Sequence, residues 1–160
     1  MAIIPVFIPH AGCPHQCVFC NQKTISGQQT ASSRDVEQQL ERYLQWIKPC
    51  PFNEAAFYGG SFTGLPADLQ TELFRPVDKL LAEGVIGSVR LSTRPDYIDA
   101  ARLELLQAHG VKTVELGVQS LDDNVLAAAE RGHQATDVYK AVSLLKHYGF
   151  EIGLQLMVGM

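Results

Sequence analysis

The sequence is short of cysteine, tryptophan and long apolar runs, and it carries no excess of basic charge. Only one tryptophan and four cysteines occur among the 160 residues. No uncharged apolar stretch approaches the roughly 20 residues of a membrane-spanning helix, so we expect no membrane contact. Lysine and arginine number 13 against 17 acidic residues, and the net charge of −4 gives no electrostatic reason to expect binding to a nucleic-acid backbone.

The first ten residues also lack the features of a secretory signal. The segment "MAIIPVFIPH" has neither a basic n-region nor a small-residue cleavage site. We therefore expect a cytoplasmic protein whose cysteines stay reduced, because disulfides are rare in that compartment. Close cysteine clusters in such a protein indicate metal or redox chemistry.

The sequence does contain an alternation of short β-branched and aromatic stretches with longer amphipathic ones. Hydrophobic residues make up 46% and charged residues 19%, which is enough for one domain with a core. Strands are expected at 3–8, 54–59, 88–93, 112–118 and 151–158, and helices at 33–48, 66–83, 96–109, 122–130 and 136–148. The repeated β-α unit predicts an α/β fold with a mostly parallel sheet and right-handed crossovers.

The last expected strand ends close to Met160, with no helical stretch after it. Parallel strands are normally covered on both faces. We therefore expect residues 1–160 to be the N-terminal part of a core domain, with about five β-α units and the remainder of a barrel missing after Met160. The alternative is that the cover comes from elsewhere.

Alternate residues on three expected strands divide into an apolar set and a polar or small set. An unpaired buried polar group costs about 1–3 kcal/mol, so a merely packed interior would not hold the second set. We expect it to face a ligand-filled lumen; a self-satisfied polar network or exposure through an unclosed barrel are the alternatives. The polar or small set comprises Arg90, Ser92, Glu115, Gly117, Gln119, Gly153, Gln155 and Met157.

Three of the four cysteines lie within eight residues, in "HAGCPHQCVFCN" directly after the first expected strand. Gly12 and Pro14 indicate a loop, and barrels of this kind place their chemistry on the loops after the strands. The fourth cysteine, Cys50, has no partner at ligand spacing and is expected to be structural. The cluster comprises Cys13, Cys17 and Cys20.

The spacing leaves four interpretations of this loop open. A zinc site would need a fourth ligand, for which only His10 or His15 lies nearby. A redox disulfide would use two cysteines and leave the third idle, and structural free thiols rarely occur in such a loop. A 4Fe-4S cluster on three thiolates keeps one iron open, as a catalytic metal centre requires. The spacing favours the cluster.

The pattern CxxxCxφC, with Phe19 as the aromatic residue, resembles the signature of the radical S-adenosylmethionine (SAM) superfamily. The motifs "FYGGSF", "STRPD", "VELGVQS" and "RGH" follow in that superfamily's order, so the resemblance covers essentially the whole chain. It is closest to the branch with the Elongator catalytic subunit and the oxygen-independent coproporphyrinogen oxidases. The resemblance implies the N-terminal portion of a partial parallel (β/α)6 TIM-like barrel.

The resemblance also implies two cofactors. Cys13, Cys17 and Cys20 would bind a 4Fe-4S cluster whose fourth iron is chelated by SAM. One electron would cleave SAM to methionine and a 5′-deoxyadenosyl radical, which abstracts a substrate hydrogen. The implied electron donor is a reductant of the flavodoxin or ferredoxin type.

A set of SAM contacts follows from the same resemblance. Ser61 stands where relatives often carry Glu. At Ser92, "STRP" departs from the "E-x-N-P" run of coproporphyrinogen oxidases and favours the Elongator-like branch. Arg131 would pair with the SAM carboxylate, with a solvated helix-end cation as the alternative. The full set is Phe19 beside the adenine, Gly59 and Gly60 near the methionyl ammonium, Ser61, Ser92, Gln119 and Arg131, and Gln155 and Met157 near the ribose and adenine.

We therefore expect a radical SAM enzyme, with tRNA as its substrate by analogy with the Elongator-like branch. The alternatives are a coproporphyrinogen-oxidase-like radical SAM enzyme and a non-catalytic zinc-binding module. Because a radical in an incomplete barrel would meet water, we expect residues 1–160 alone to bind a cluster without robust turnover.

Overall fold

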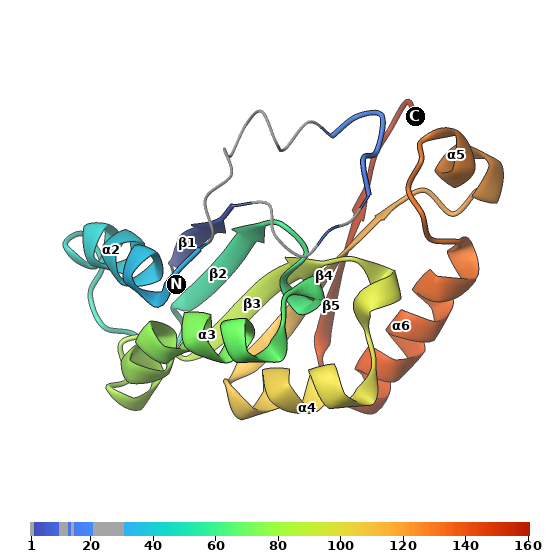
Figure 1. Ribbon diagram of the computed structural model, residues 1–160. Helices are drawn as coiled ribbons and strands as arrows, with labels where there is room; N and C mark the ends of the chain where they lie inside the picture. Colours follow the sequence, from blue (N-terminus) through green and yellow to red (C-terminus); the bar gives the residue numbers. More distant parts are fainter. Residues whose placement is uncertain (1, 10–12, 14, 21–30) are drawn as a thin grey trace.

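Five parallel strands form one sheet in the computed structural model, which describes residues 2–9, 13, 15–20 and 31–160. Each strand pairs with the next one along the chain, so every crossover advances the sheet by one strand (Figure 1). This is the order of a TIM-like barrel, and the predicted α/β class is confirmed. The strands are β1 (Ile3–Ile8), β2 (Glu54–Gly59), β3 (Ser88–Thr93), β4 (Val111–Gln119) and β5 (Glu151–Leu156).

The helices that connect these strands lie mainly along one face of the sheet. Figure 1 shows α2, α3, α4 and α6 on that face, whereas α5 lies near the carboxyl ends of the strands, as residues 15–20 do. The helices are α2 (Ser33–Leu44), α3 (Ala67–Ala82), α4 (Ala100–Ala108), α5 (Asp123–Ala128) and α6 (Ala135–His147), with 3-10 helices η1 (Phe62–Gly64) and η2 (Pro95–Tyr97).

Two helix boundaries differ from the sequence prediction by four residues, and the others by no more than two. The helix expected at 33–48 ends at Leu44, because the prolines at 49 and 51 disfavour helical backbone just before them. The helix expected at 96–109 begins only at Ala100, where the Asp99 side chain accepts a hydrogen bond from the backbone N–H of Arg102. Residues 95–97 before it form η2 instead.

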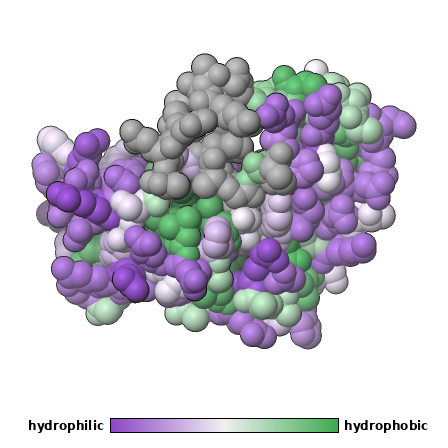
Figure 2. Space-filling view, viewed as in Figure 1, coloured by the Kyte–Doolittle hydropathy of each residue, from purple (hydrophilic) through white to green (hydrophobic). Residues whose placement is uncertain are grey.

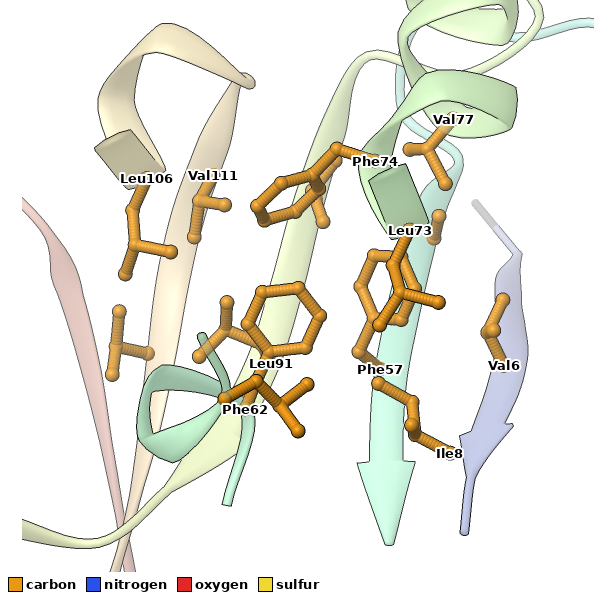
Figure 3. Packing of buried hydrophobic residues seen from close by; sticks show 14 of the residues in the cluster. Val6, Ile8, Phe57, Phe62, Leu73, Phe74, Val77, Leu91, Leu106 and Val111 are labelled. Atoms are coloured by element: carbon orange, nitrogen blue, oxygen red, sulfur yellow. The ribbon is translucent and has the colours of Figure 1, made fainter. Parts of the chain in front are cut away.

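The hydrophobic core fills the space between this helical layer and the sheet. Three phenylalanines lie at its centre (Figure 3), with ring centroids 4.9 Å apart for Phe57 and Phe62, 5.5 Å for Phe57 and Phe74 and 4.8 Å for Phe62 and Phe74. Alternate strand residues complete the core: Ile4, Val6, Ile8, Val89, Leu91, Val114, Leu116 and Val118 are all buried. The predicted alternation is therefore confirmed on β3 and β4, and the polar set points away from the helices.

The apolar face of β5 is less covered. Leu154 is 51% exposed although it pairs with the buried Leu116 on β4, and Leu156, which pairs with Gln119 beyond a shift in register, is 62% exposed. The strand ends at Leu156 instead of the predicted residue 158, because the register with β4 shifts between Gly117 and Gln119. That residues 1–160 are the first part of a longer barrel stays a prediction.

The outer surface is mixed in polarity. Figure 2 shows hydrophilic residues over most of this side of the molecule, with apolar patches between them. Across the described residues, no helix combines the length and the apolar composition needed to cross a membrane.

Candidate functional site

A cavity of about 170 Å³ opens at the carboxyl ends of the strands. Its wall combines the cysteine loop, the ends of β2, β3, β4 and β5 and the segment after α5. All of the predicted site residues except Met157 line it, and His15, Thr93, Arg94 and Gly117 join them. The lining residues are Cys13, His15, Cys17, Phe19, Cys20, Gly59, Gly60, Ser61, Ser92, Thr93, Arg94, Gly117, Gln119, Arg131 and Gln155.

The three loop cysteines are free thiols on the wall of this cavity. Cys17 is buried, at 5% exposed, whereas Cys13 and Cys20 are partly exposed. The backbone N–H of Cys20 donates to the Cys17 carbonyl (2.9 Å), and that of Val18 donates to Ala129 (3.2 Å). These bonds form a turn that is tied to the end of α5, so the loop presents its thiols toward the strand ends.

Within the described part of the chain, the arrangement of ligating side chains does not separate the zinc interpretation from the cluster interpretation, because Cys13, Cys17 and Cys20 belong to both. No three His, Cys, Asp or Glu side chains there are arranged around a single ion. His10, one of its two candidate fourth ligands, lies outside the described residues. Thiolate is also the ligand type that iron–sulfur clusters take, and three thiols on one cavity wall fit such a group.

Arg94 is a site residue that the sequence reasoning missed. Its side chain is 97% buried. Nε and Nη2 donate to the two carboxylate oxygens of Asp96 (2.9 Å each), and Nη2 also donates to the Arg131 carbonyl (2.7 Å). The remaining nitrogen, Nη1, donates to Cys13 Sγ (3.9 Å). Burial opposes its charge, but the hydrogen bonds and charge of Asp96 hold the pKa of Arg94 above its ordinary value. The motif "STRPD" contains a sequence signal for this ion pair, because Asp96 comes two residues after Arg94.

Arg131 contacts a second cysteine of the loop. Its Nη1 donates to Cys17 Sγ (3.6 Å) and its Nη2 to the Gly117 carbonyl. The residue is only 8% exposed, so the alternative of a solvated helix-end cation is wrong. Among the described residues its buried Nε has no hydrogen-bond partner, an arrangement that suits an acceptor arriving with a ligand.

Glycine and strained backbone shape the strand ends. At Gly59, φ is +117°, and an added Cβ would come within 2.1 Å of the Ile8 carbonyl oxygen, so no other residue fits. Gln119, at the end of β4, has a left-handed φ of 69°, which is uncommon for a residue other than glycine. The backbone N–H of Met157 bonds to the Gln119 carbonyl (3.0 Å), and Met157 is not among the residues that line the cavity.

Hydroxyl groups connect the ends of β2 and β3. Ser61 Oγ and Thr93 Oγ1 are 2.9 Å apart, Thr63 Oγ1 and Thr93 Oγ1 are 2.5 Å apart, and all three groups are buried. The backbone N–H of Arg94 donates to Ser61 Oγ (3.3 Å). Ser61 therefore fixes the start of the segment that carries Arg94, a function that the resemblance did not suggest.

A polar ladder runs across the inner face of the sheet from β2 to β5. Arg90 donates from Nε to Glu54 (2.8 Å) and from Nη1 to Glu115 Oε1 (3.0 Å). Glu115 Oε2 accepts from Gln155 Nε2 (2.9 Å) and from Ser92 Oγ (3.3 Å). The predicted polar set therefore forms hydrogen bonds within itself, and its members Ser92 and Gln155 also reach the cavity wall.

Two histidines lie beside the arginines. His133 is 5% exposed, and neither ring nitrogen has a hydrogen-bond partner in the part of the chain that the structure describes. Burial, with help from Arg131 and Arg94, lowers its pKa to about 4. Burial and the Arg94 charge also lower the pKa of His15. The His15 ring packs so closely on Gly132 that a Cβ there would come within 2.2 Å of it. Both imidazoles are therefore neutral near pH 7.

Two known proteins match all or most of this chain and extend well beyond it. The tRNA uridine(34) acetyltransferase of Methanocaldococcus infernus is 26% identical over 100% of this chain, which spans 37% of that relative's length. The heme chaperone HemW of Bacillus subtilis is 26% identical over 92% of this chain, which matches 40% of that relative. The chain thus spans less than half the length of either.

The fold has a counterpart among solved structures. The structure of archaeal M. infernus Elp3 with an N-terminal deletion superposes with a TM-score of 0.73 at 22% identity, covering 99% of this chain and 38% of that one. Residues 7–160 match the family model described as the radical SAM superfamily, which is nearly the entire chain. Taken with the cavity that the cysteine loop and the strand ends enclose, this match shows that the chain belongs to the radical SAM superfamily of enzymes.

Proposed function

We propose that Cys13, Cys17 and Cys20 hold a 4Fe-4S cluster and that the adjoining strand ends bind SAM. The observation that carries this proposal is that all three thiols line one cavity with the glycine-rich ends of the strands. Three thiolates leave one iron of a cubane cluster for another ligand. The remaining wall offers small residues and hydrogen-bonding groups, which suit a polar nucleotide cofactor.

When bound, the cluster and SAM would supply one-electron chemistry for hydrogen abstraction, with the electron coming from an external reductant. The chain's own residues bind SAM and orient it. Gly59 and Gly60 would let the backbone of this strand end approach the methionyl ammonium. At Gly59 the place of a side chain is already taken by the Ile8 carbonyl, so the approach there is by the backbone itself. Phe19 is the aromatic group for the adenine, and Gln119 is a polar contact at the end of β4.

Arg131 is proposed to bind the carboxylate of SAM. The unpartnered, buried Nε supports this, since a guanidinium that lacks an acceptor on one edge is suited to bind a carboxylate there. Ser92 and Gln155 are proposed to contact the ribose and adenine end. Glu115 accepts hydrogen bonds from both side chains and so holds them at the cavity wall.

The proposal is tested by anaerobic reconstitution with ferrous salt and sulfide, followed by metal analysis and electron paramagnetic resonance. We expect about four irons and four sulfides per chain, and a change in the spectrum of the reduced cluster on addition of SAM. The Cys17→Ala variant should lose the cluster. The matched Cys50→Ala variant should keep it, because Cys50 does not line the cavity. Zinc without iron or sulfide would contradict the proposal.

We further propose that the full-length protein modifies tRNA. The support is the similarity to a protein named tRNA uridine(34) acetyltransferase over the whole of this chain. Nucleoside mass spectrometry of tRNA from cells that lack this protein should show loss of a modified uridine. Restoring the wild-type protein should recover it, and restoring the Cys17→Ala variant should not. Unchanged tRNA nucleosides, or decarboxylation of a porphyrinogen by the purified protein, would contradict this assignment.

A further inference from the structure

Arg94 holds three parts of the site together with one buried side chain. Asp96 occupies the Nε and Nη2 edge of the guanidinium at 2.9 Å, and the Arg131 carbonyl takes a second bond from Nη2. Two parallel hydrogen bonds to one carboxylate fix the orientation of the guanidinium plane. Its Nη1 is therefore aimed at Cys13 Sγ, 3.9 Å away and 81 residues earlier in the chain.

We propose that Arg94 is a positioning residue that donates an N–H···S hydrogen bond to the Cys13 thiolate and thereby raises the reduction potential of the cluster. This inference rests on the proposed cluster site. Hydrogen bonds to the ligand sulfurs and the charge around a cluster are two of the factors that set its potential. Uptake of an electron makes the cluster more negative, so a donor and a positive charge beside it favour the reduced form.

The location of the pair makes this effect strong. Arg94 is 3% exposed, so little water screens its charge. Asp96 neutralises the guanidinium overall, but it binds the edge that faces away from Nη1. Cys13 Sγ therefore contacts the guanidinium at Nη1, whereas the carboxylate contacts it at Nε and Nη2. Removing the cation and removing the carboxylate should consequently shift the potential in opposite directions.

Potentiometric titration of the reconstituted protein, followed by electron paramagnetic resonance, tests the proposal. For Arg94→Gln we expect about a tenfold fall in the ratio of reduced to oxidised cluster at a fixed potential, equivalent to about 59 mV for one electron. For Asp96→Asn we expect a shift to higher potential, because the cation then lacks its counter-charge. A purely structural role would give no such opposite pair of shifts.

Arg102→Gln is the matched control. Arg102 is also an arginine paired with an aspartate, Asp99, and it lies near the same Tyr97 ring as Arg94, but it does not line the cysteine cavity. Its substitution should leave the potential unchanged.

The outcomes separate the two proposals. A wild-type protein that binds no cluster overturns both of them. A cluster whose potential is the same in wild type, Arg94→Gln and Asp96→Asn overturns only the role of Arg94. If Arg94→Gln does not fold, Asp96→Asn alone decides: a higher potential supports the proposal, and an unchanged or lower one overturns it.

Discussion

The guanidinium Nη1 of Arg131 lies 3.6 Å from Cys17 Sγ, although 114 residues separate the two along the chain. Arg94 approaches Cys13 in the same way across 81 residues. Two of the three proposed cluster ligands are thus each contacted by a buried arginine from a later β-α unit. The site therefore depends on contacts between the cysteine loop and two later segments, one that follows β3 and one that follows α5.

Replacing Arg131 with lysine should weaken SAM binding to the reconstituted protein about tenfold or more. Lysine keeps the charge but cannot make a bidentate contact, and a hydrogen bond to a charged group contributes about 1.5–3 kcal/mol. Isothermal titration calorimetry under anaerobic conditions measures the affinity. Arg102→Lys is the control, and equal SAM affinity in the Arg131→Lys protein would contradict the proposed role.

Replacing Glu115 with glutamine should lower the free energy of unfolding by about 1–3 kcal/mol. The change removes the ion pair to Arg90 and one of the acceptors for Ser92 and Gln155 in a partly buried ladder. Urea denaturation measures it. Lys112→Ala is the control: its pair with Glu151 is 64% and 61% exposed, and such surface pairs contribute about 0–1 kcal/mol. Equal effects of the two substitutions would show that the ladder adds nothing to stability.

Substituting Gly59 with alanine should destabilise the protein more than the same change at Gly84. Both glycines have positive φ, at 117° and 68°, but a Cβ at Gly59 meets the Ile8 carbonyl oxygen whereas one at Gly84 meets nothing within 4 Å. Backbone strain alone costs about 1–3 kcal/mol, and the clash adds to it only at Gly59. Thermal unfolding of the two variants measures the difference. Equal melting temperatures would contradict the close approach of β1 and β2 at this point.

Stability should rise with pH between about 4 and 6.5 in a way that depends on His133. Its pKa is lowered from 6.5 to about 4 in the folded protein, so the unfolded chain binds more protons across this interval. The effect can reach roughly 3 kcal/mol, since one pKa unit corresponds to about 1.4 kcal/mol. Urea unfolding at several pH values should show a smaller slope for His133→Gln than for wild type. Parallel pH profiles would contradict a buried, neutral imidazole.

The sequence was sufficient to predict the α/β class with its parallel sheet and which residues of β3 and β4 face inward. Arg90, Glu115 and Gln155 were placed on one side of the sheet by alternation alone, and the structure joins them in the polar ladder. Alternation works here because the side-chain period of a strand is two, whatever its neighbours are. It could not say whether these residues would bond to a ligand or to one another, because that depends on the side chains of adjacent strands.

Contacts that depend on the exact register or on distant loops could not be predicted. Arg94 was missed because its partners, Cys13 and the Arg131 carbonyl, come from segments that only the folded sheet brings together. Met157 was assigned to the lumen by alternation from Gln155. The left-handed φ of Gln119 shifts the pairing with β5, which ends at Leu156 before that alternation can continue.

The wide separation of Cys17 and Arg131 also has a consequence during translation. A ribosome adds about 5–20 residues per second, so the 114 residues between them take roughly 6–23 s to synthesise. Throughout that time the newly made loop carries its thiols without the guanidinium that later contacts Cys17. Iron and sulfide that reach the nascent chain would therefore bind to thiols without this positive charge beside them, whereas in the finished domain the charge is in place.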